Sequence, residues 1–215
     1  MTKWQLILSP NTSGAANMAA DLALFNNYES GKSDTSTLRI FSWEPKCVSY
    51  GYSQKPVKKE GWDAVRRPTG GGIVYHEAGE VSYSIVTSIE NPQLPEGLIP
   101  SYLAISEILV EALKQLGVRA KIFGSKKRSR DVQSQALLCF AEPAEYEIVS
   151  HGQKIVGSAQ KRGKRAMLQQ GTICLNGFGF AELSGALSRA FGNRLCYNMP
   201  DERIESSALL GTTAR

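Results

Sequence analysis

The chain has 215 residues, of which 42% are hydrophobic, so it can bury one sizeable core but hardly two large domains. Its net charge of +5 is compatible with an acidic protein, a nucleic acid or a membrane surface as a partner, and charge cannot choose among them. No apolar run has the length of a signal peptide or a membrane span. We therefore expect a single domain over residues 1–215, without a C-terminal accessory domain, in the cytoplasm.

The cysteine pattern argues against a structural zinc site and against a secreted disulfide framework. The 4 cysteines lie far apart, no two of them form a Cys-x-x-Cys pair, and only 2 histidines are available as further ligands. The sequence therefore predicts no metal site.

Short strands and one helix are expected in the first quarter of the chain. Apolar residues alternate over 4–8 and 37–41, as is typical of strands, and they recur at helical spacing over 15–28. Residues 47–54 are expected to form a further strand and loop.

The stretch 66–76 reads Arg-Arg-Pro-Thr-Gly-Gly-Gly-Ile-Val-Tyr-His and has the composition of a ligand-binding loop. Its three glycines let a ligand approach the backbone closely, and they tolerate backbone angles that other residues resist. The spacing matches neither of the common phosphate-binding signatures. Short strands are expected over 73–75 and 81–86, with Gly79 in the turn between them. A glycine-rich hairpin without a ligand is the alternative, which the flanking Arg66, Arg67 and His76 disfavour.

The second half of the chain predicts a core-covering helix over 101–116 and a shorter helix over 180–191. A hairpin is expected with its turn at 151–152, followed by a strand over 169–175. The run 125–130 carries four positive charges in six residues, and it is either a solvated loop or a docking surface for an acidic protein. Because no aromatic residue lies in this run, a nucleic acid is not expected as a partner.

Three stretches together resemble one known family. The stretch 66–76 is similar to the signature of the lipoate-protein ligase and lipoyl/octanoyl transferase superfamily, which shares its catalytic fold with biotin-protein ligases. Residues 154–160, Lys-Ile-Val-Gly-Ser-Ala-Gln, and residues 170–172, Gln-Gly-Thr, resemble the two motifs that follow in that superfamily. The resemblance covers residues 17–191. It implies an α/β (α+β) fold in which helices flank a mixed, largely antiparallel sheet.

The pair Cys139-Phe140 is similar to the cysteine-dependent octanoyl transferases of this superfamily, in which a proline and a tyrosine follow before the lysine motif, as Pro143 and Tyr146 do here. The resemblance implies that Cys139 is a nucleophile that forms a thioester. It also implies that Lys154 lies at the carbonyl end of the acyl group, where a cation stabilises the developing oxyanion. The substrate-binding residues that it implies are Arg66, Gly70, Gly71, Gly72, His76, Gly157, Ser158 and Ala159.

The implied activity is transfer of an octanoyl or lipoyl group from an acyl carrier protein thioester to a specific lysine of a lipoyl domain or glycine-cleavage H protein. Neither a metal nor a nucleotide is then needed, and no membrane partner is expected. The nearest alternative is an ATP-dependent lipoate-protein ligase, which would bind ATP and Mg²⁺ at the glycine loop and Lys154. Gly72 supports that alternative, because several cysteine-dependent transferases have arginine there. A biotin-protein ligase fits less well, since its glycine loop differs in composition, and a non-catalytic module that binds lipoyl domains is a further alternative.

Overall fold

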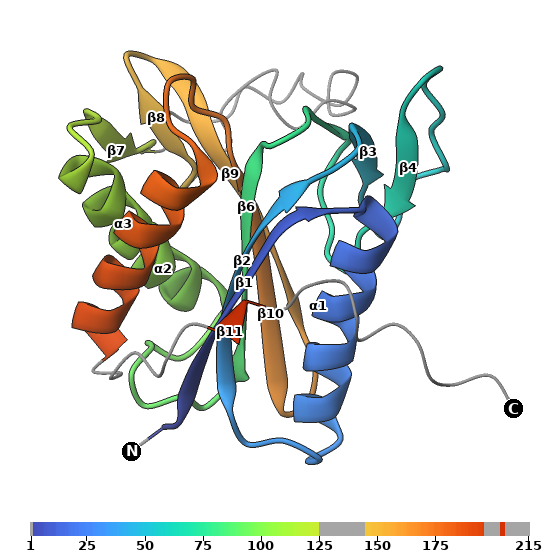
Figure 1. Cartoon of the computed structure of the whole chain (residues 1–215). Coiled ribbons are helices and arrows are strands. Elements are labelled where there is room, and N and C mark those ends of the chain that lie inside the picture. The colour runs from blue at the N-terminus through green and yellow to red at the C-terminus, as the bar shows by residue number, and fades with distance from the viewer. Residues whose placement is uncertain (1, 125–144, 196–202, 205–215) are drawn as a thin grey trace, which may run out of the picture.

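The computed structural model describes residues 2–124, 145–195 and 203–204. In this part of the chain a mixed sheet of eight strands crosses the protein in the order β11-β1-β2-β6-β10-β9-β8-β7 (Figure 1). Strand β1 runs parallel to β2 and β11, and the other neighbours are antiparallel. The expected mixed, largely antiparallel sheet is thus confirmed. The strands are β1 (Trp4–Thr12), β2 (Ser36–Trp43), β6 (Val81–Ser88), β7 (Ala120–Ile122), β8 (Ile148–Ser150), β9 (Gln153–Arg162), β10 (Ala166–Ile173) and β11 (Arg203–Ile204).

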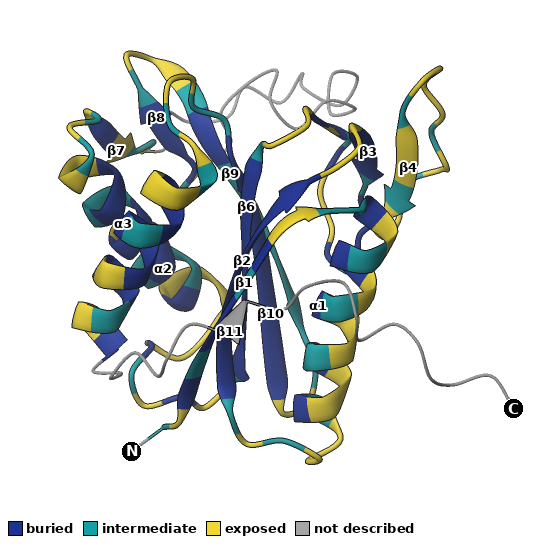
Figure 2. Cartoon of the chain, viewed as in Figure 1, coloured by how far each residue is buried: buried dark blue, intermediate teal, exposed yellow. Residues whose placement is uncertain are grey.

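Helices cover both faces of this sheet. Helix α1 (Gly14–Glu29) lies on one face, and α2 (Leu98–Gln115) and α3 (Phe180–Leu195) lie on the other (Figure 1). The helices expected over 15–28, 101–116 and 180–191 are therefore confirmed. Strands β2 and β10 are buried at every position (Figure 2), because helices exclude water from both of their faces. None of the helices in the described residues is long and apolar enough to cross a membrane.

A second, smaller sheet packs against the first turn of α1. It consists of β3 (Cys47–Tyr50), β4 (Asp63–Arg66) and β5 (Val74–His76) in the order β4-β3-β5. The close approach requires glycine at position 14, since a Cβ there would meet the sulfur of Cys47. The two strands expected on either side of Gly79 do form, but β5 belongs to the small sheet and β6 to the large one. The turn between them therefore joins the two sheets.

Polar contacts in the interior fix α1 on the large sheet. Both Arg39 Nη1 and Ser84 Oγ donate to Asp21 Oδ1, at 3.1 and 2.7 Å, and Gln170 Nε2 donates to Asp21 Oδ2 at 2.6 Å. Arg39 Nη2 also donates to Asn17 Oδ1 at 2.6 Å. Arg39 and Asp21 are only 3% and 0% exposed, so these bonds replace the water that each charge loses on burial. The network holds α1 at a fixed place over β2, β6 and β10.

We predict that Arg39→Met lowers the free energy of unfolding by about 3–5 kcal/mol, because it removes one partner of a buried ion pair while nearly keeping its volume. Urea denaturation measures this change. The exposed pair Arg194–Glu107, at 3.2 Å with side chains 51% and 59% exposed, provides the control. Arg194→Met should cost less than about 1 kcal/mol. Equal losses in the two variants would contradict the structural role of the Asp21–Arg39 pair.

Candidate active site

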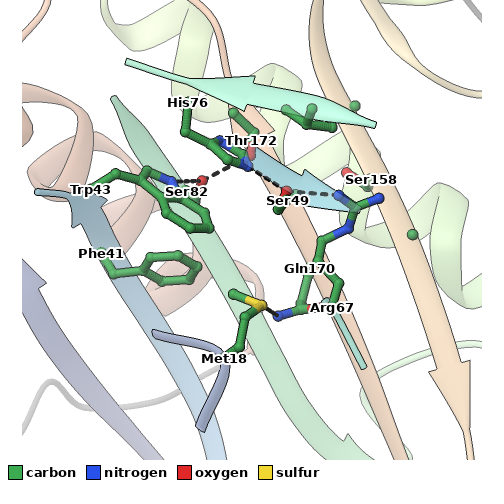
Figure 3. A pocket seen from close by; sticks show the side chains of 14 residues that line it. Met18, Phe41, Trp43, Ser49, Arg67, His76, Ser82, Ser158, Gln170 and Thr172 are labelled. Atoms are coloured by element: carbon green, nitrogen blue, oxygen red, sulfur yellow. Dashed lines mark hydrogen bonds between the residues drawn. The ribbon is translucent and has the colours of Figure 1, made fainter. Parts of the chain in front are cut away.

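A narrow cavity of about 40 Å³ lies between the large sheet, the small sheet and α1 (Figure 3). Strands of both sheets contribute to its wall, because the turn after β5 brings the two sheets together. The residues that line it are Met18, Phe41, Trp43, Ser49, Arg67, Val74, His76, Ser82, Gly157, Ser158, Ala159, Gln170, Gly171 and Thr172.

Aromatic and aliphatic side chains form one side of the cavity. The Trp43 ring stacks on the ring of His76, with centroids 3.8 Å apart and planes 8° apart, and Phe41 meets Trp43 edge-on at 5.7 Å. Met18 and Val74 extend this apolar surface. Apolar walls of this kind suit an apolar ligand, since both lose contact with water on binding.

The guanidinium of Arg67 holds the glycine-rich loop against the small sheet. Its Nη1 donates to Ser49 Oγ at 2.7 Å, and its Nη2 donates to the carbonyl oxygens of Gly70 and Gly72 at 3.1 and 2.6 Å. Between these two, Gly71 has a φ of +90°, which a residue with a side chain rarely adopts. The glycine triplet thus bends around a buried cation, and Arg67 is 8% exposed.

His76 connects the cavity to a carboxyl group outside it. Its Nε2 lies 2.6 Å from Ser49 Oγ, and its Nδ1 lies 2.9 Å from Glu80 Oε1. Burial, helped by the positive charge of Arg67, lowers the pKa of His76 well below its usual value. Burial raises the pKa of Glu80 to about 8. Both shifts favour a protonated carboxyl beside a neutral imidazole over an ion pair.

Beside Glu80 lies a half-buried thiol. Cys174 Sγ donates to Glu80 Oε2 at 3.8 Å. Burial raises the pKa of this thiol, and the neighbouring Glu80 raises it further, while the charge of Lys154 acts in the opposite direction. Glu80 and Cys174 therefore influence each other's ionisation, and Lys154 lies close enough to act on the thiol.

Lys154 lies on β9, three positions before Gly157. Its Nζ donates to Glu147 Oε1 at 2.6 Å, and the side chains are 2% and 8% exposed. The lysine is thus a buried cation and not an exposed hairpin residue. Within the described residues, no group of three or more His, Cys, Asp or Glu side chains is placed to hold a metal ion.

The structure brings together only some of the residues expected from sequence. His76, Gly157, Ser158 and Ala159 line the cavity. The three glycines of the loop border it, because the lining residue Arg67 binds the carbonyl oxygens of Gly70 and Gly72. Lys154, on β9, is not among the lining residues and is buried against Glu147. Cys139 and the basic run 125–130 lie outside the described residues.

Arg66 does not line the cavity, contrary to our expectation. It is exposed, and its Nη1 donates to the carbonyl oxygens of Tyr52 and Gln54 at 2.6 and 2.8 Å. Its neighbour Arg67 faces the cavity instead, because successive residues of an extended segment point to opposite sides. Half-buried Val65 marks the inward side, and this alternation could have identified Arg67 from the sequence.

Other cavity residues were not predicted. Ser49 and Trp43 carry no local motif, and their place in the cavity follows from the pairing of distant strands. Gln170 belongs to a motif that we did recognise. Its Oε1 accepts from Thr69 Oγ1 at 2.7 Å, which links β10 to the segment before the glycine loop.

We predict that Gly51→Ala displaces the glycine-rich loop and lowers the free energy of unfolding by about 1–3 kcal/mol, because the added Cβ would meet the carbonyl oxygen of Gly71. Urea denaturation measures the loss. Gly70→Ala is the matched control, since a Cβ there has no neighbouring atom within 4 Å. If Gly51→Ala is tolerated as well as Gly70→Ala, the loop does not depend on this close approach.

Comparison with known proteins agrees with this fold and these motifs. The family model of the lipoyl protein ligase A/B catalytic domain matches residues 13–198. The octanoyltransferase LipM of Kyrpidia tusciae is 38% identical over 186 residues, covering 82% of this chain and 67% of the relative. The LipM of Carboxydothermus hydrogenoformans is 39% identical over 187 residues, covering 81% and 66%. The matched region thus spans about two thirds of the length of these relatives.

Solved structures show the same fold at lower identity. A putative lipoate protein ligase from T. acidophilum with bound lipoic acid superposes with a TM-score of 0.74 and 22% identity, covering 95% of this chain and 90% of that one. LipL1 of P. falciparum in complex with lipoate has a TM-score of 0.69 and 20% identity, covering 94% and 65%. The family match over most of the chain and the identity to the LipM proteins lead to one conclusion: the chain belongs to the lipoyl protein ligase A/B catalytic domain family.

Proposed function

We propose that the protein transfers an octanoyl group from the thioester of an acyl carrier protein to a specific lysine of a lipoyl domain or glycine-cleavage H protein. The observation that carries this proposal is the identity of 35–39% to octanoyltransferases over about four fifths of the chain. A lipoyl group, which has the same chain with two sulfur atoms, is the close variant of this substrate.

The geometry of the cavity supports the proposal. The acyl chain lies along the apolar side formed by Met18, Phe41 and Trp43, and its thioester carbonyl points toward Lys154. A buried cation beside the carbonyl stabilises negative charge more strongly than an exposed one, because water screens it less. The substrate-binding residues in this proposal are those that line the cavity, with Arg67 in place of Arg66 and with the glycine loop as its rim.

The proposed chemistry has two steps and uses Cys139 as the relay. Cys139 loses its proton and attacks the thioester carbonyl as the thiolate, and the carrier-protein thiolate leaves and takes up a proton. The amine of the acceptor lysine then attacks the acyl-cysteine and loses a proton, and the Cys139 thiolate leaves and takes up a proton as the amide forms. Because the donor thioester is already activated, the reaction consumes no nucleotide.

We predict that Cys139→Ser abolishes transfer from octanoyl acyl carrier protein. Mass spectrometry of the wild-type protein after incubation with this donor should show one octanoyl group, on Cys139, that hydroxylamine removes. Cys174→Ser is the control, since the proposal gives Cys174 no covalent role, and it should still be acylated. A fully active Cys139→Ser variant would refute the relay.

A second prediction separates the chemical role of Lys154 from its structural role. Lys154→Met should slow transfer by about 10²–10³, the usual cost of losing an oxyanion-stabilising group. It should also destabilise the fold, because it takes the cation from the buried carboxyl of Glu147.

The double variant Lys154→Met/Glu147→Met removes both charges. Thermal denaturation should then show recovery of much of the lost stability, while the transfer rate remains low. Recovery of the rate together with the stability would mean that Lys154 only supports the fold.

A further inference from the structure

The polar side chains on one face of β6 and β10 form successive pairs across the two strands. Ser84 lies opposite Gln170, and Ser82 lies opposite Thr172. Ser82 Oγ and Thr172 Oγ1 are 2.8 Å apart, and Trp43 Nε1 donates to Ser82 Oγ at 2.9 Å. Trp43, Ser82 and Thr172 therefore satisfy one another's polar groups. They can face an apolar ligand without leaving a polar atom unsatisfied.

Glu80 continues this row just beyond the cavity, two positions before Ser82. It contacts Cys174 on one side through Oε2 and His76 on the other through Oε1. The thiol donates to Oε2, which therefore acts as an acceptor. Oε1 either carries the proton and donates to His76 Nδ1, or it accepts a hydrogen from Nδ1.

The proton of Glu80 decides what Ser49 offers to the cavity. Ser49 Oγ accepts from Arg67 and lies 2.6 Å from His76 Nε2. If Glu80 donates to Nδ1, then Nε2 carries the ring hydrogen and donates to Ser49. Ser49 then accepts two hydrogen bonds, and its own O–H is directed to the cavity that it lines. If Glu80 is a carboxylate, the Ser49 hydroxyl donates to Nε2 and is no longer available there.

We propose that Glu80 is a positioning residue that donates a hydrogen bond to His76 Nδ1 and, through this ring, presents the Ser49 hydroxyl as a donor to the acyl ligand. The ring is well held for this role, because it stacks on Trp43 and is 1% exposed. The acceptor that every acyl thioester carries is its carbonyl oxygen, so the proposed partner is this oxygen. The link to acyl binding rests on the proposed function, whereas the position of the ring hydrogen does not.

The charged and titratable neighbours support the uncharged state of the pair. Burial is the main cause that raises the pKa of Glu80, and the negative charge of Glu77 also raises it, while the hydrogen bonds with Cys174 and with the backbone of Glu77 act in the opposite direction. Arg67 opposes a second positive charge on His76. Lys154 acts on the adjacent Cys174 thiol. A protonated Glu80 beside a neutral imidazole is the arrangement that these causes favour.

Long-range ¹H–¹⁵N NMR correlations of ¹⁵N-histidine-labelled protein at pH 7 test the proposal directly. The chain has only 2 histidines, and the exposed His151 gives an internal reference signal. We expect His76 to be neutral, with its hydrogen on Nε2. A hydrogen on Nδ1 in the wild-type protein would overturn the proposal without any variant.

Two substitutions of Glu80 extend the test. In Glu80→Gln the amide N–H can donate to Nδ1 while the amide oxygen accepts from Cys174, so this variant imitates the protonated acid. It should keep the ring hydrogen on Nε2 and change the KM for octanoyl acyl carrier protein by less than about threefold. Glu80→Leu has no hydrogen-bonding group. In this variant the His76 ring should be a mixture of the forms that carry the hydrogen on Nδ1 and on Nε2. The KM should rise about three- to tenfold, with a smaller change in kcat.

Glu107→Leu, on α2 and with a side chain 59% exposed in the wild type, is the control and should change neither result. Ser49→Ala should raise KM as Glu80→Leu does. The double variant Ser49→Ala/Glu80→Leu should not raise KM above that of either single variant, because each substitution removes the same hydrogen-bond donor to the acyl ligand. A Glu80→Gln variant that behaves like Glu80→Leu would refute the donor role. The NMR test of the ring hydrogen does not depend on the proposed function, so its result remains decisive even if the protein transfers no octanoyl group.

Discussion

The site depends on one buried cation, Arg67. Its five N–H donors lie in a fixed plane, and they reach the small sheet through Ser49 and the glycine-rich loop through two carbonyl oxygens. A lysine could not hold both at once, because its single ammonium lacks this planar geometry. Burial is the main cause that lowers the pKa of the neighbouring His76, and the positive charge of Arg67 lowers it further. Arg67 thus contributes both to the shape of the loop and to the uncharged state of the cavity wall.

The cavity exists because two sheets meet where α1 begins. Polar bonds hold helix α1 there together with its buried apolar side chains, and the carboxyl of Asp21 joins Arg39 of β2, Ser84 of β6 and Gln170 of β10. Gln170 in turn accepts from Thr69, just before the glycine loop. A continuous chain of hydrogen bonds thus runs from the helix through the large sheet to the rim of the cavity. A rigid support of this kind suits the proposed role of the site, which would hold a flexible acyl chain in one position.

Local patterns in the sequence were sufficient to predict the helices and strands, but not to predict which strands pair. Apolar periodicity located all three described helices, and the glycine and lysine motifs located His76 and Gly157–Ala159 in the cavity. The two strands on either side of Gly79 were expected, but their placement in different sheets was not, because pairing depends on contacts between residues far apart in the chain. The motif contains both Arg66 and Arg67, and we expected Arg66 in the cavity, whereas only the alternation of the strand distinguishes the two. The contact of Glu80 with His76 depends on the turn geometry, which a short-range pattern does not contain.

The central claim is that the donor arrives already activated as a thioester. Its most direct test is the intact mass of a lipoyl domain after incubation with this protein under two conditions. One mixture contains octanoyl acyl carrier protein and no nucleotide, and the other contains free lipoate with ATP and Mg²⁺. Our account predicts that the lipoyl domain gains one octanoyl group in the first mixture and remains unmodified in the second. Modification in the second mixture alone would contradict it and identify an ATP-dependent ligase.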